Sequence, residues 1–230
     1  MLSKLRALFG ELGVGAGSVY LLDRVLRKIS HRCGVYLYEL VVQPIGDKPL
    51  LPPRLSKNIR FHEIAEHDAD MQRLLARPEI KVSRFAQGAV CLGVYRLDVL
   101  IGHVWFCFGR YEEDEVRCDF RLPAPGDAWD FDLYVFPEHR MGIGFMAVWD
   151  AAFAYLRERG VARSFSRVNR FNLASRRAHA RLGSRPVGSA LFVKLGHTEL
   201  TLSSAAPFVG LTRRRRLALQ VPNPGPAAAA

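Results

Sequence analysis

The feature that most constrains this chain is a change of hydrophobic period across a turn that contains two glycines, within residues 129–159. Polar and apolar residues alternate over 129–136, which is typical of a strand, whereas 142–159 places apolar residues at helical spacing. The turn between them contains Gly142 and Gly144, and glycine lets a ligand approach the backbone closely. A helix N-terminus adds unpaired N–H groups and a partial positive charge. This segment therefore predicts a strand, a turn and a helix that form an anion site suited to a pyrophosphate.

The glycine pair has other interpretations. Gly142, Gly144 and Ala147 fit the G-x-G-x-x-G/A spacing of dinucleotide-binding folds. That pattern requires an acidic residue at the end of the next strand, whereas the predicted strand 165–168 runs into Asn169. The Gly-Lys-Ser/Thr signature of a nucleoside-triphosphate loop is also missing from the sequence. A Gly-x-Gly pair at such a turn can serve packing alone, so the turn by itself leaves that alternative open.

The remaining segments predict a mixed set of strands and helices. The expected strands are 35–42, 59–64, 89–96, 100–108, 116–122, 165–168, 187–195 and 199–202, and the expected helices are 12–32, 66–76 and 173–182. Pro78 is expected to end the helix 66–76, because the residue before a proline disfavours helical geometry. The stretch 204–230 is basic and then rich in Pro and Ala, which predicts a disordered tail.

Composition limits the class of protein. The 230 residues contain 49% hydrophobic and 24% charged residues, which excludes a disordered chain, and the net charge of +11 favours phosphate-rich partners. The four cysteines show no C-x-x-C spacing, so no metal site is expected. Free thiols and the lack of a signal peptide or a long apolar run predict a cytoplasmic location. The basic amphipathic helix 12–32 could cover a core or lie on a membrane surface.

A second pattern lies downstream of the turn. Asn172 precedes the helix 173–182, which Gly183 ends, and Asn172 is expected to cap it with Ser175 at the N3 position. Together the two patterns resemble the GNAT superfamily of acyl-CoA N-acyltransferases, whose motifs look like V-x-P-x-x-R-G-x-G-x-G and N-x-x-A/S-x-x-x-Y-x-x-x-G-F. The residues that carry the resemblance are Val135, Pro137, Arg140, Gly142 and Gly144 in the first motif, and Asn172, Ser175, His179 and Gly183 in the second.

The resemblance covers about Ile59 to Leu202 and implies a GNAT-like α+β fold. This is a mixed, mostly antiparallel central sheet flanked by helices. The resemblance divides the chain into three parts: an N-terminal extension over 1–56, an acyl-CoA-binding domain over 57–203 and the tail 204–230. The extension is expected to consist of a helix and a strand that pack on the core. The segment around 155–183 is similar to bacterial members found with exopolysaccharide biosynthesis.

The same resemblance implies acetyl-CoA as acyl donor, without a metal. The donor-binding residues that it implies are Val135, Phe136, Arg140, Met141, Gly142, Ile143, Gly144, Asn172 and Ser175. Asp130 or Asp132, expected on one strand face with Tyr134, would take a proton from the amine directly or through water. His179 would protonate the leaving thiolate, with Tyr134 in reserve. A solvated strand face and a surface histidine are the plainer alternatives for these residues.

Three departures from the family pattern keep an alternative open. Counted from Arg140, the loop is one residue short; with the glycines aligned instead, His139 takes the arginine position. His179 stands where the second motif has tyrosine, and Ser184 where it has an aromatic residue. The expected reaction is transfer of an acetyl group to a primary amine of a small molecule or an amino sugar. The alternative is a catalytically weak CoA-binding or scaffold module.

The basic tail and the N-terminal helix leave the partners open. Either segment could dock the chain on a membrane or an assembly, which would suit the scaffold alternative. Nucleic acid is not expected as a partner, because no aromatic residues interleave with the arginines at 213–216. The oligomeric state cannot be read from the sequence.

Overall fold

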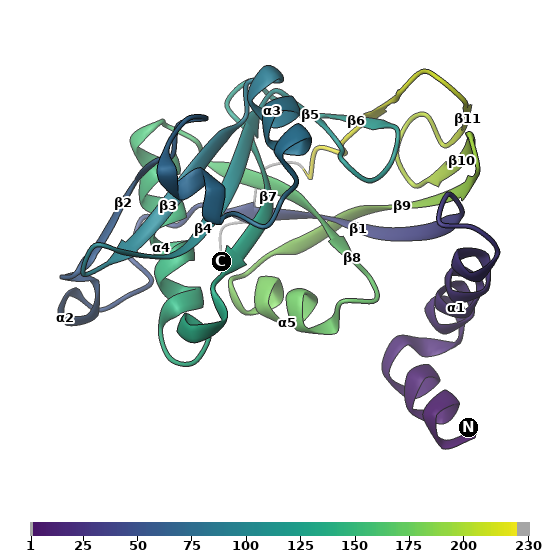
Figure 1. The fold of residues 1–230 in the computed structure, drawn as a ribbon, viewed down its shortest axis with the longest axis horizontal. Helices are drawn as coiled ribbons and strands as arrows, with labels where there is room; N and C mark the ends of the chain where they lie inside the picture. The colour runs from purple at the N-terminus through teal and green to yellow at the C-terminus, as the bar shows by residue number, and fades with distance from the viewer. Residues whose placement is uncertain (1, 225–230) are drawn as a thin grey trace. The chain divides into compact units, whose positions relative to one another are not determined.

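The computed structural model describes residues 2–224, and the chain divides into two compact units. The first unit comprises Met1–Gln43, Glu112–Pro123 and Ser166–Ala230, and the second comprises Pro44–Tyr111 and Ala124–Phe165. Each unit combines strands with helices, and most strand pairs are antiparallel (Figure 1). The expected α+β class, with a mostly antiparallel sheet flanked by helices, is confirmed. Among the described residues 2–224 there is no helix with the length and hydropathy that a membrane span requires.

The second unit contains the strand, turn and helix on which the sequence analysis depends. Its strands follow the order β8-β7-β4-β3-β2, antiparallel except for the parallel pair β7 and β8. Their bounds are β2 (Ile59–Glu63), β3 (Val90–Arg96), β4 (Val99–Phe108), β7 (Ala128–Val135) and β8 (Arg163–Asn169), the last of which continues into the first unit. The other elements are α2 (Pro53–Ser56), η1 (Ala69–Arg73), α3 (Pro78–Ala86), β5 (Arg110–Glu112), η2 (Pro137–His139) and α4 (Gly144–Glu158).

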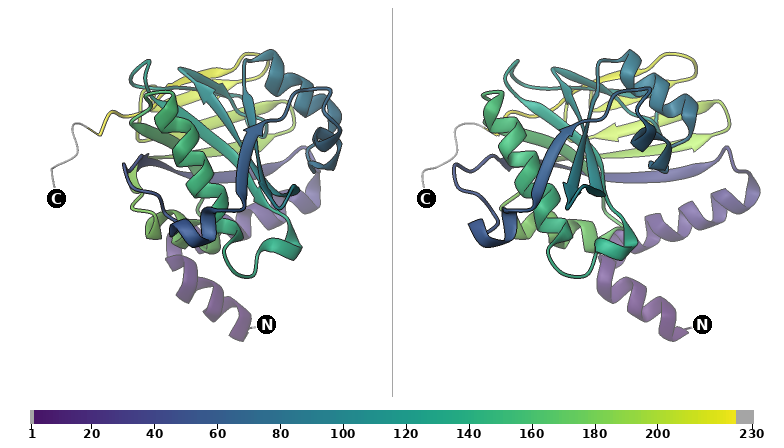
Figure 2. Two further views of the ribbon diagram at one scale, coloured as in Figure 1. Left: turned by 90° about the vertical axis from the view of Figure 1, so that its left-hand side faces the viewer. Right: turned by 60° about the vertical axis from the view of Figure 1, so that its left-hand side comes forward.

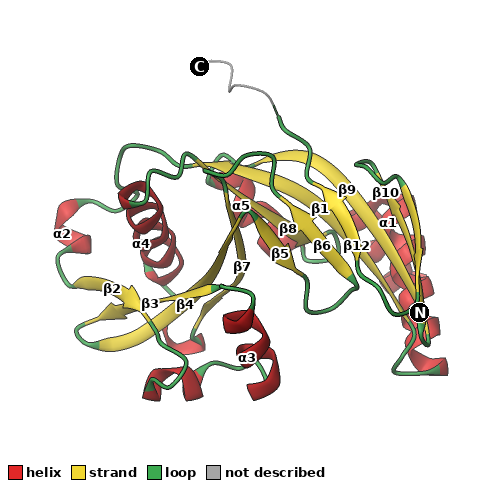
Figure 3. Ribbon diagram, turned by 90° about the horizontal axis from the view of Figure 1, so that it is seen from above, coloured by secondary structure: helices red, strands yellow, loops and turns green. Residues whose placement is uncertain are grey.

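Helices α3 and α4 cover opposite faces of this sheet. On the α4 face, the rings of Phe106 and Tyr155 stack with centroids 5.6 Å apart. On the α3 face, Phe85 meets Trp105 edge to face at 5.1 Å. Figure 3 shows the two helices on different sides of β3 and β4, and Figure 2 shows α4 running along the strands of its unit in both views. Side chains on both faces of β4 are therefore buried, which explains its nearly continuous apolar run.

The first unit contains the other strands and the helices α1 and α5. Its larger sheet has the order β11-β10-β9-β1, with every pair antiparallel. The bounds are β1 (Gly34–Pro44), β9 (Arg185–Leu195), β10 (Thr198–Ser203) and β11 (Val209–Thr212). Strands β6 (Cys118–Arg121) and β12 (Leu217–Gln220) form a parallel pair. The helices are α1 (Leu2–Ile29), which breaks at Gly13, and α5 (Leu173–Arg181).

Two expectations about secondary structure were wrong. No α-helix covers 66–76; the short 3₁₀ helix η1 lies there, and Pro78 begins α3 instead of ending a helix. Proline suits the first helical turn, because the N–H it lacks would have no partner there. Arg77 takes the extended conformation that a following proline favours, at φ −61° and ψ 148°.

The region expected to be a disordered tail also differs from the prediction. Strands β11 and β12 lie inside 204–230, where the basic and Pro-rich composition suggested disorder. Each is a short run that pairs with a neighbour, β11 with β10 and β12 with β6. Composition averaged over the tail hid these two runs. Residues 225–230, the end of the predicted tail, lie outside the described residues.

Candidate active site

A β-bulge in β7 sets the geometry of the candidate site. Gly102 and His103 of β4 pair with Val135 and Tyr134, and Trp105 pairs with Phe131, so Val104 faces two residues, Asp132 and Leu133. Asp132 absorbs the extra residue with a left-handed backbone at φ 48°, which aspartate tolerates better than most residues. The bulge shifts the alternation that the sequence predicted for this strand.

Because of the bulge, Phe131 and Tyr134 share the α3 face, although simple alternation predicted opposite faces. The ring of Phe131 lies 6.1 Å from that of Trp105, and the ring of Tyr134 lies 5.8 Å from that of His103. These ring contacts lie on the side of the sheet that α3 covers. The simple alternation expected over 129–136 would put Phe131 and Tyr134 on opposite faces, and it fails at the bulge.

The two candidate aspartates have different environments. Asp130 is 3% exposed and accepts a hydrogen bond from the Ser164 hydroxyl at 2.5 Å. Asp132 is exposed and pairs with Arg84, with 2.5 Å between Nη1 and Oδ2. The structure therefore does not bring the two carboxylates together on one solvated face, and only Asp132 is open to a substrate.

Arg84 fixes the position of Asp132. This arginine of α3 is 6% exposed, and its guanidinium lies 5.1 Å from the ring centroids of both Trp105 and Phe131. A planar cation that contacts two neighbouring aromatic rings is held in orientation as well as in position. The Asp132 carboxylate is consequently presented to solvent from a rigid support.

His103 lies in the same region and was not singled out by the sequence analysis. It is 2% exposed, and its Nδ1 has no hydrogen-bond partner among residues 2–224. Burial lowers the pKa of His103 to about 4, against an opposing effect of Asp132 and with smaller contributions from Arg84 and Lys81. The signal that could have found it is a lone histidine inside the apolar strand β4.

The buried His103 predicts a loss of stability in mild acid. Its folded pKa of about 4 lies below the ordinary value of 6.5, so the stability that depends on its neutral form is complete above pH 6.5 and is lost as the pH falls toward 4. We expect the free energy of unfolding to drop by about 2 kcal/mol between pH 7 and pH 5 from this group. Urea titrations at both pH values would measure the drop.

The matched variant for this measurement is His103→Phe, which keeps an aromatic ring and removes the titration. The variant should show a smaller drop than the wild type; part of the slope should remain, because burial also lowers the pKa of His179 to about 4. Equal slopes for the variant and the wild type would contradict the assignment.

The turn after β7 keeps the glycines and Arg140 close to the end of the strand. Arg140 donates from Nε to the Val135 carbonyl at 2.9 Å, and its guanidinium lies 5.0 Å from the Tyr134 ring centroid. Gly142 has φ +94°, a conformation that favours glycine. A side chain at Gly144 would be blocked, because its Cβ would lie 2.1 Å from the His139 carbonyl oxygen. Glycine is therefore required by the backbone dihedral at Gly142 and by the close approach of the His139 carbonyl at Gly144.

The backbone at the N-terminus of α4 is a candidate anion site, although Gly144 itself is buried. No side chain caps Ile143 at its start, and the first helical bond runs from the Ala147 N–H to the Ile143 carbonyl at 2.8 Å. The N–H groups of Gly144 and the two residues after it therefore have no carbonyl partner within the helix. A cavity of about 70 Å³ adjoins this turn, and Arg96 and Met141 are among its lining residues.

The end of β7 is less open than the turn. The Phe136 N–H donates to the Ile101 carbonyl at 3.0 Å, so the backbone N–H of this residue, which the resemblance assigned to donor binding, already has a partner. Within the described residues, no group of three or more His, Cys, Asp or Glu side chains is arranged to hold a metal ion.

The second motif lies in the first unit. The Asn172 side chain accepts a hydrogen bond from the Ser175 N–H at 3.0 Å, which confirms the expected N-cap of α5. His179 is half-buried, and with a pKa of about 4 it is neutral at pH 7. A neutral imidazole of this kind is a poor proton donor, so its charge state does not favour the acid role that the resemblance implied.

Comparison with known proteins identifies the segment that carries both motifs. Residues 57–184 match the family model described as the acetyltransferase (GNAT) family. A search of curated proteins finds no match.

Several solved structures are similar at low identity. One is a GCN5-related glucosamine N-acetyltransferase region of a fungal multi-domain GH3 β-N-acetylglucosaminidase (16% identity, TM-score 0.47), of which the match covers 22%, against 74% of this chain. A functionally unknown conserved protein from Staphylococcus epidermidis shows 12% identity and TM-score 0.49, over 77% of this chain and 67% of that one. A GCN5-related N-acetyltransferase from Kribbella flavida shows 13% identity and a TM-score of 0.43, and the match covers 74% of this chain and 62% of that one. The chain thus spans less than two thirds of the first and third of these.

Proposed function

Because this chain belongs to the GNAT family and is therefore an acyltransferase, we propose that it moves an acetyl group from acetyl-CoA to a primary amine of a small molecule or sugar intermediate. The observation that carries the proposal is the uncapped N-terminus of α4 directly after the turn with Gly142 and Gly144. This site lies inside the segment that matches the family.

The turn has the features that a diphosphate requires. A Cβ at Gly142 would meet no atom within 4 Å, so the backbone there is accessible. The N–H groups at the start of α4 and the positive end of the helix suit an anion. Among residues 2–224, the Arg140 side chain is hydrogen-bonded through Nε alone, to Val135, which leaves its two terminal nitrogens as donors. We assign the diphosphate of acetyl-CoA to this turn; when bound, the donor supplies an acetyl thioester.

We assign the proton transfers to the α3 face of β7. Asp132 is exposed and held by Arg84, so its carboxylate can take the proton that the amine nitrogen loses as it bonds to the acetyl carbon. The sulfur that leaves needs a proton, and the hydroxyl of half-buried Tyr134 is our candidate donor. His103 packs beside the Tyr134 ring and, being neutral at pH 7, adds no competing charge.

A charge placed in the turn tests the donor site. Met141 is 91% exposed and lines the cavity, so Met141→Glu adds a negative charge with no loss of packing. Repulsion of a diphosphate a few ångströms away should weaken acetyl-CoA binding by about 10- to 100-fold. Calorimetric titration would measure the dissociation constants. The control is Met141→Gln, of nearly the same shape and without charge; equal affinities of the two variants would refute the site.

Activity is tested by incubating the protein with acetyl-CoA and a panel of amino sugars, amino acids and polyamines. The expected result is release of free CoA thiol together with a product heavier by one acetyl group.

The scaffold alternative is favoured by one observation, the neutral His179 at the tyrosine position of the motif. Tight acetyl-CoA binding without any acetylated product across the panel would favour it over the enzyme.

A further inference from the structure

The first unit exposes apolar residues on one face of its larger sheet. In register across β1, β9, β10 and β11, one row consists of Val35, Val193, Leu200 and Leu211. The parallel row two residues further along consists of Leu37, Leu191, Leu202 and Val209. Residues two apart in a strand share a face, so both rows lie on the same side. At β10 and β11 these side chains are exposed, and Leu211 and Val209 are exposed by 71% and 64%.

Helix α1 of the same unit presents a second apolar surface. Among residues 9–29 of this helix, the exposed large apolar side chains are Val14, Leu22, Val25 and Ile29. At 100° per residue these four fall within one stripe about 80° wide. Asp23, on the opposite side of the helix, is buried and accepts a hydrogen bond from the Val35 N–H at 2.8 Å. The stripe therefore faces away from the sheet of its own unit.

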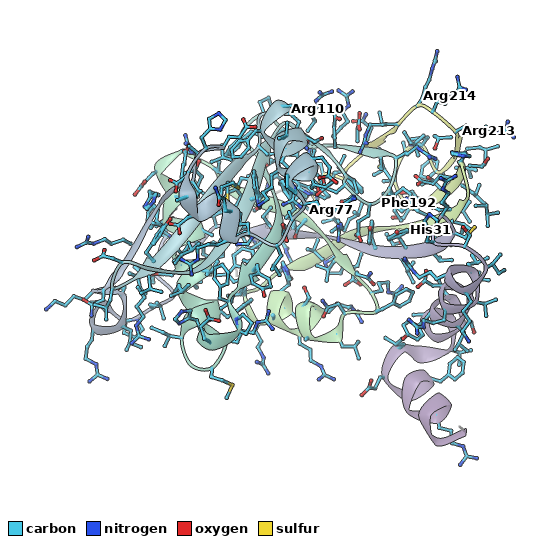
Figure 4. All side chains as sticks on the ribbon, viewed as in Figure 1. His31, Arg77, Arg110, Phe192, Arg213 and Arg214 are labelled. Atoms are coloured by element: carbon cyan, nitrogen blue, oxygen red, sulfur yellow. The ribbon has the colours of Figure 1, made fainter. Side chains whose placement is uncertain are left out.

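Positive charge adjoins both surfaces. Arg213, Arg214 and Arg215, here called the basic turn, are exposed and form no ion pair among residues 2–224. Figure 4 shows the side chains of Arg213 and Arg214 extending away from the ribbon. Arg216 differs, because it pairs with Asp119 at 2.5 Å and donates to backbone carbonyls. The basic turn is thus unoccupied by the protein's own acids.

The basic turn and the end of α1 lie at the same end of the sheet. Gly34, Lys194, Glu199 and Thr212 are successive partners across the four strands, so they form one row. Arg213 directly follows Thr212, the last residue of β11, and Arg32 lies two residues before Gly34, the first residue of β1. Three strand spacings separate the two positions, roughly 15 Å. Lys28 and Arg32 thus add to the charge at this end of the unit.

Glu11 of α1 is exposed, but it lies before the break at Gly13, and beyond that break the helix and the strands β10 and β11 expose no acid. In the segments 12–32 and 195–218, all of which the structure describes, the only acidic residues are Asp23 and Glu199, exposed by 8% and 0%. Every exposed side chain there is apolar, neutral or cationic. A surface that mixes exposed leucine and valine with unpaired arginine, and that has no exposed acid, complements an anionic lipid surface.

We propose that this part of the first unit binds an anionic lipid bilayer, with the basic turn at the headgroups and the apolar residues of β10, β11 and α1 at the acyl boundary. A second copy of the chain is a poorer occupant, because two such surfaces would bring like charges together. Nucleic acid is poorer too, because it offers no apolar partner for Leu211 or Val25.

Vesicle sedimentation with the full chain tests the proposal. The protein should sediment with phosphatidylcholine vesicles that contain phosphatidylserine, should not sediment with phosphatidylcholine alone, and should be released by high salt. Replacing Arg213, Arg214 and Arg215 with serine should weaken binding on the order of a hundredfold. The matched control replaces Lys48, Arg54 and Lys57 of the second unit with serine. These three side chains are also exposed, and their replacement removes the same amount of charge, so the control variant should bind vesicles as the wild type does.

A second variant tests the apolar contribution. Leu22→Gln with Val25→Gln changes only exposed side chains of α1 and should weaken vesicle binding roughly tenfold without unfolding the protein. No binding to phosphatidylserine vesicles, or an equal loss in the Lys48, Arg54 and Lys57 control, would overturn the proposal. Two further results would also overturn the proposal. One is a wild-type protein that does not bind vesicles but forms a dimer in light scattering, with the dimer lost in the Leu22→Gln, Val25→Gln variant. The other is binding to duplex DNA without binding to vesicles.

Discussion

Asp132→Asn is expected to lower kcat/KM for acetyl transfer by about 10²- to 10⁴-fold at neutral pH, the usual contribution of a positioned general base. Asparagine keeps the size of the side chain and also tolerates the left-handed backbone that the bulge imposes at φ 48°. It cannot take a proton from the amine. The fold, the bulge and the donor site should therefore persist while proton transfer is lost, and acetyl-CoA affinity should stay within about twofold of the wild type.

Asp98→Asn is the matched control for this variant. Asp98 is also an aspartate in the left-handed region, at φ 64°, and also pairs with an arginine, Arg60, at 3.3 Å. It lies in the turn between β3 and β4, and its replacement should leave kcat/KM unchanged. Steady-state release of CoA thiol would measure both variants on the amine found to be acetylated. Equal rates for Asp132→Asn and the wild type would remove Asp132 from the mechanism and leave the donor-site proposal standing.

The sequence predicted the parts of the site that depend on local order. Apolar residues that recur at every second position and then at helical spacing, with glycines between the two stretches, were enough to predict β7, the turn and α4. Asn172 as an N-cap was likewise predictable, because capping depends on residues only three apart. These features require no knowledge of what lies across the sheet.

The bulge was not predictable in the same way. The alternation of polar and apolar residues over 129–136 continues straight through Asp132, although the backbone there inserts an extra residue opposite Val104. What stabilises it is a partner 48 residues away, Arg84, in a helix that the sequence analysis did not predict. The exposure of the Asp130 and Asp132 side chains depends on this pairing between residues far apart in the sequence. The sequence alone could therefore name both aspartates but could not distinguish the buried one from the exposed one.

In the first unit, Arg167→Met is expected to lower the free energy of unfolding by about 3–5 kcal/mol, as loss of one partner of a buried ion pair does. Arg167 donates from Nε and Nη2 to the two carboxylate oxygens of Glu113, each at 2.8 Å. The Glu113 side chain is 0% exposed, so the variant leaves a carboxylate buried without its guanidinium. The guanidinium also lies 4.5 Å from the Tyr38 ring centroid, and methionine retains part of that apolar contact.

Arg60→Met supplies the comparison, because it breaks an ion pair whose side chains are 78% and 82% exposed. Screening by water makes such pairs worth little, and the change should stay below about 0.5 kcal/mol. Urea denaturation of both variants would measure the difference. The double variant Arg167→Met with Glu113→Gln should be less destabilised than the two single changes added together, because no unpaired charge then remains buried. Strict additivity would mean that Arg167 stabilises this unit through packing, and that the paired charge contributes nothing to it.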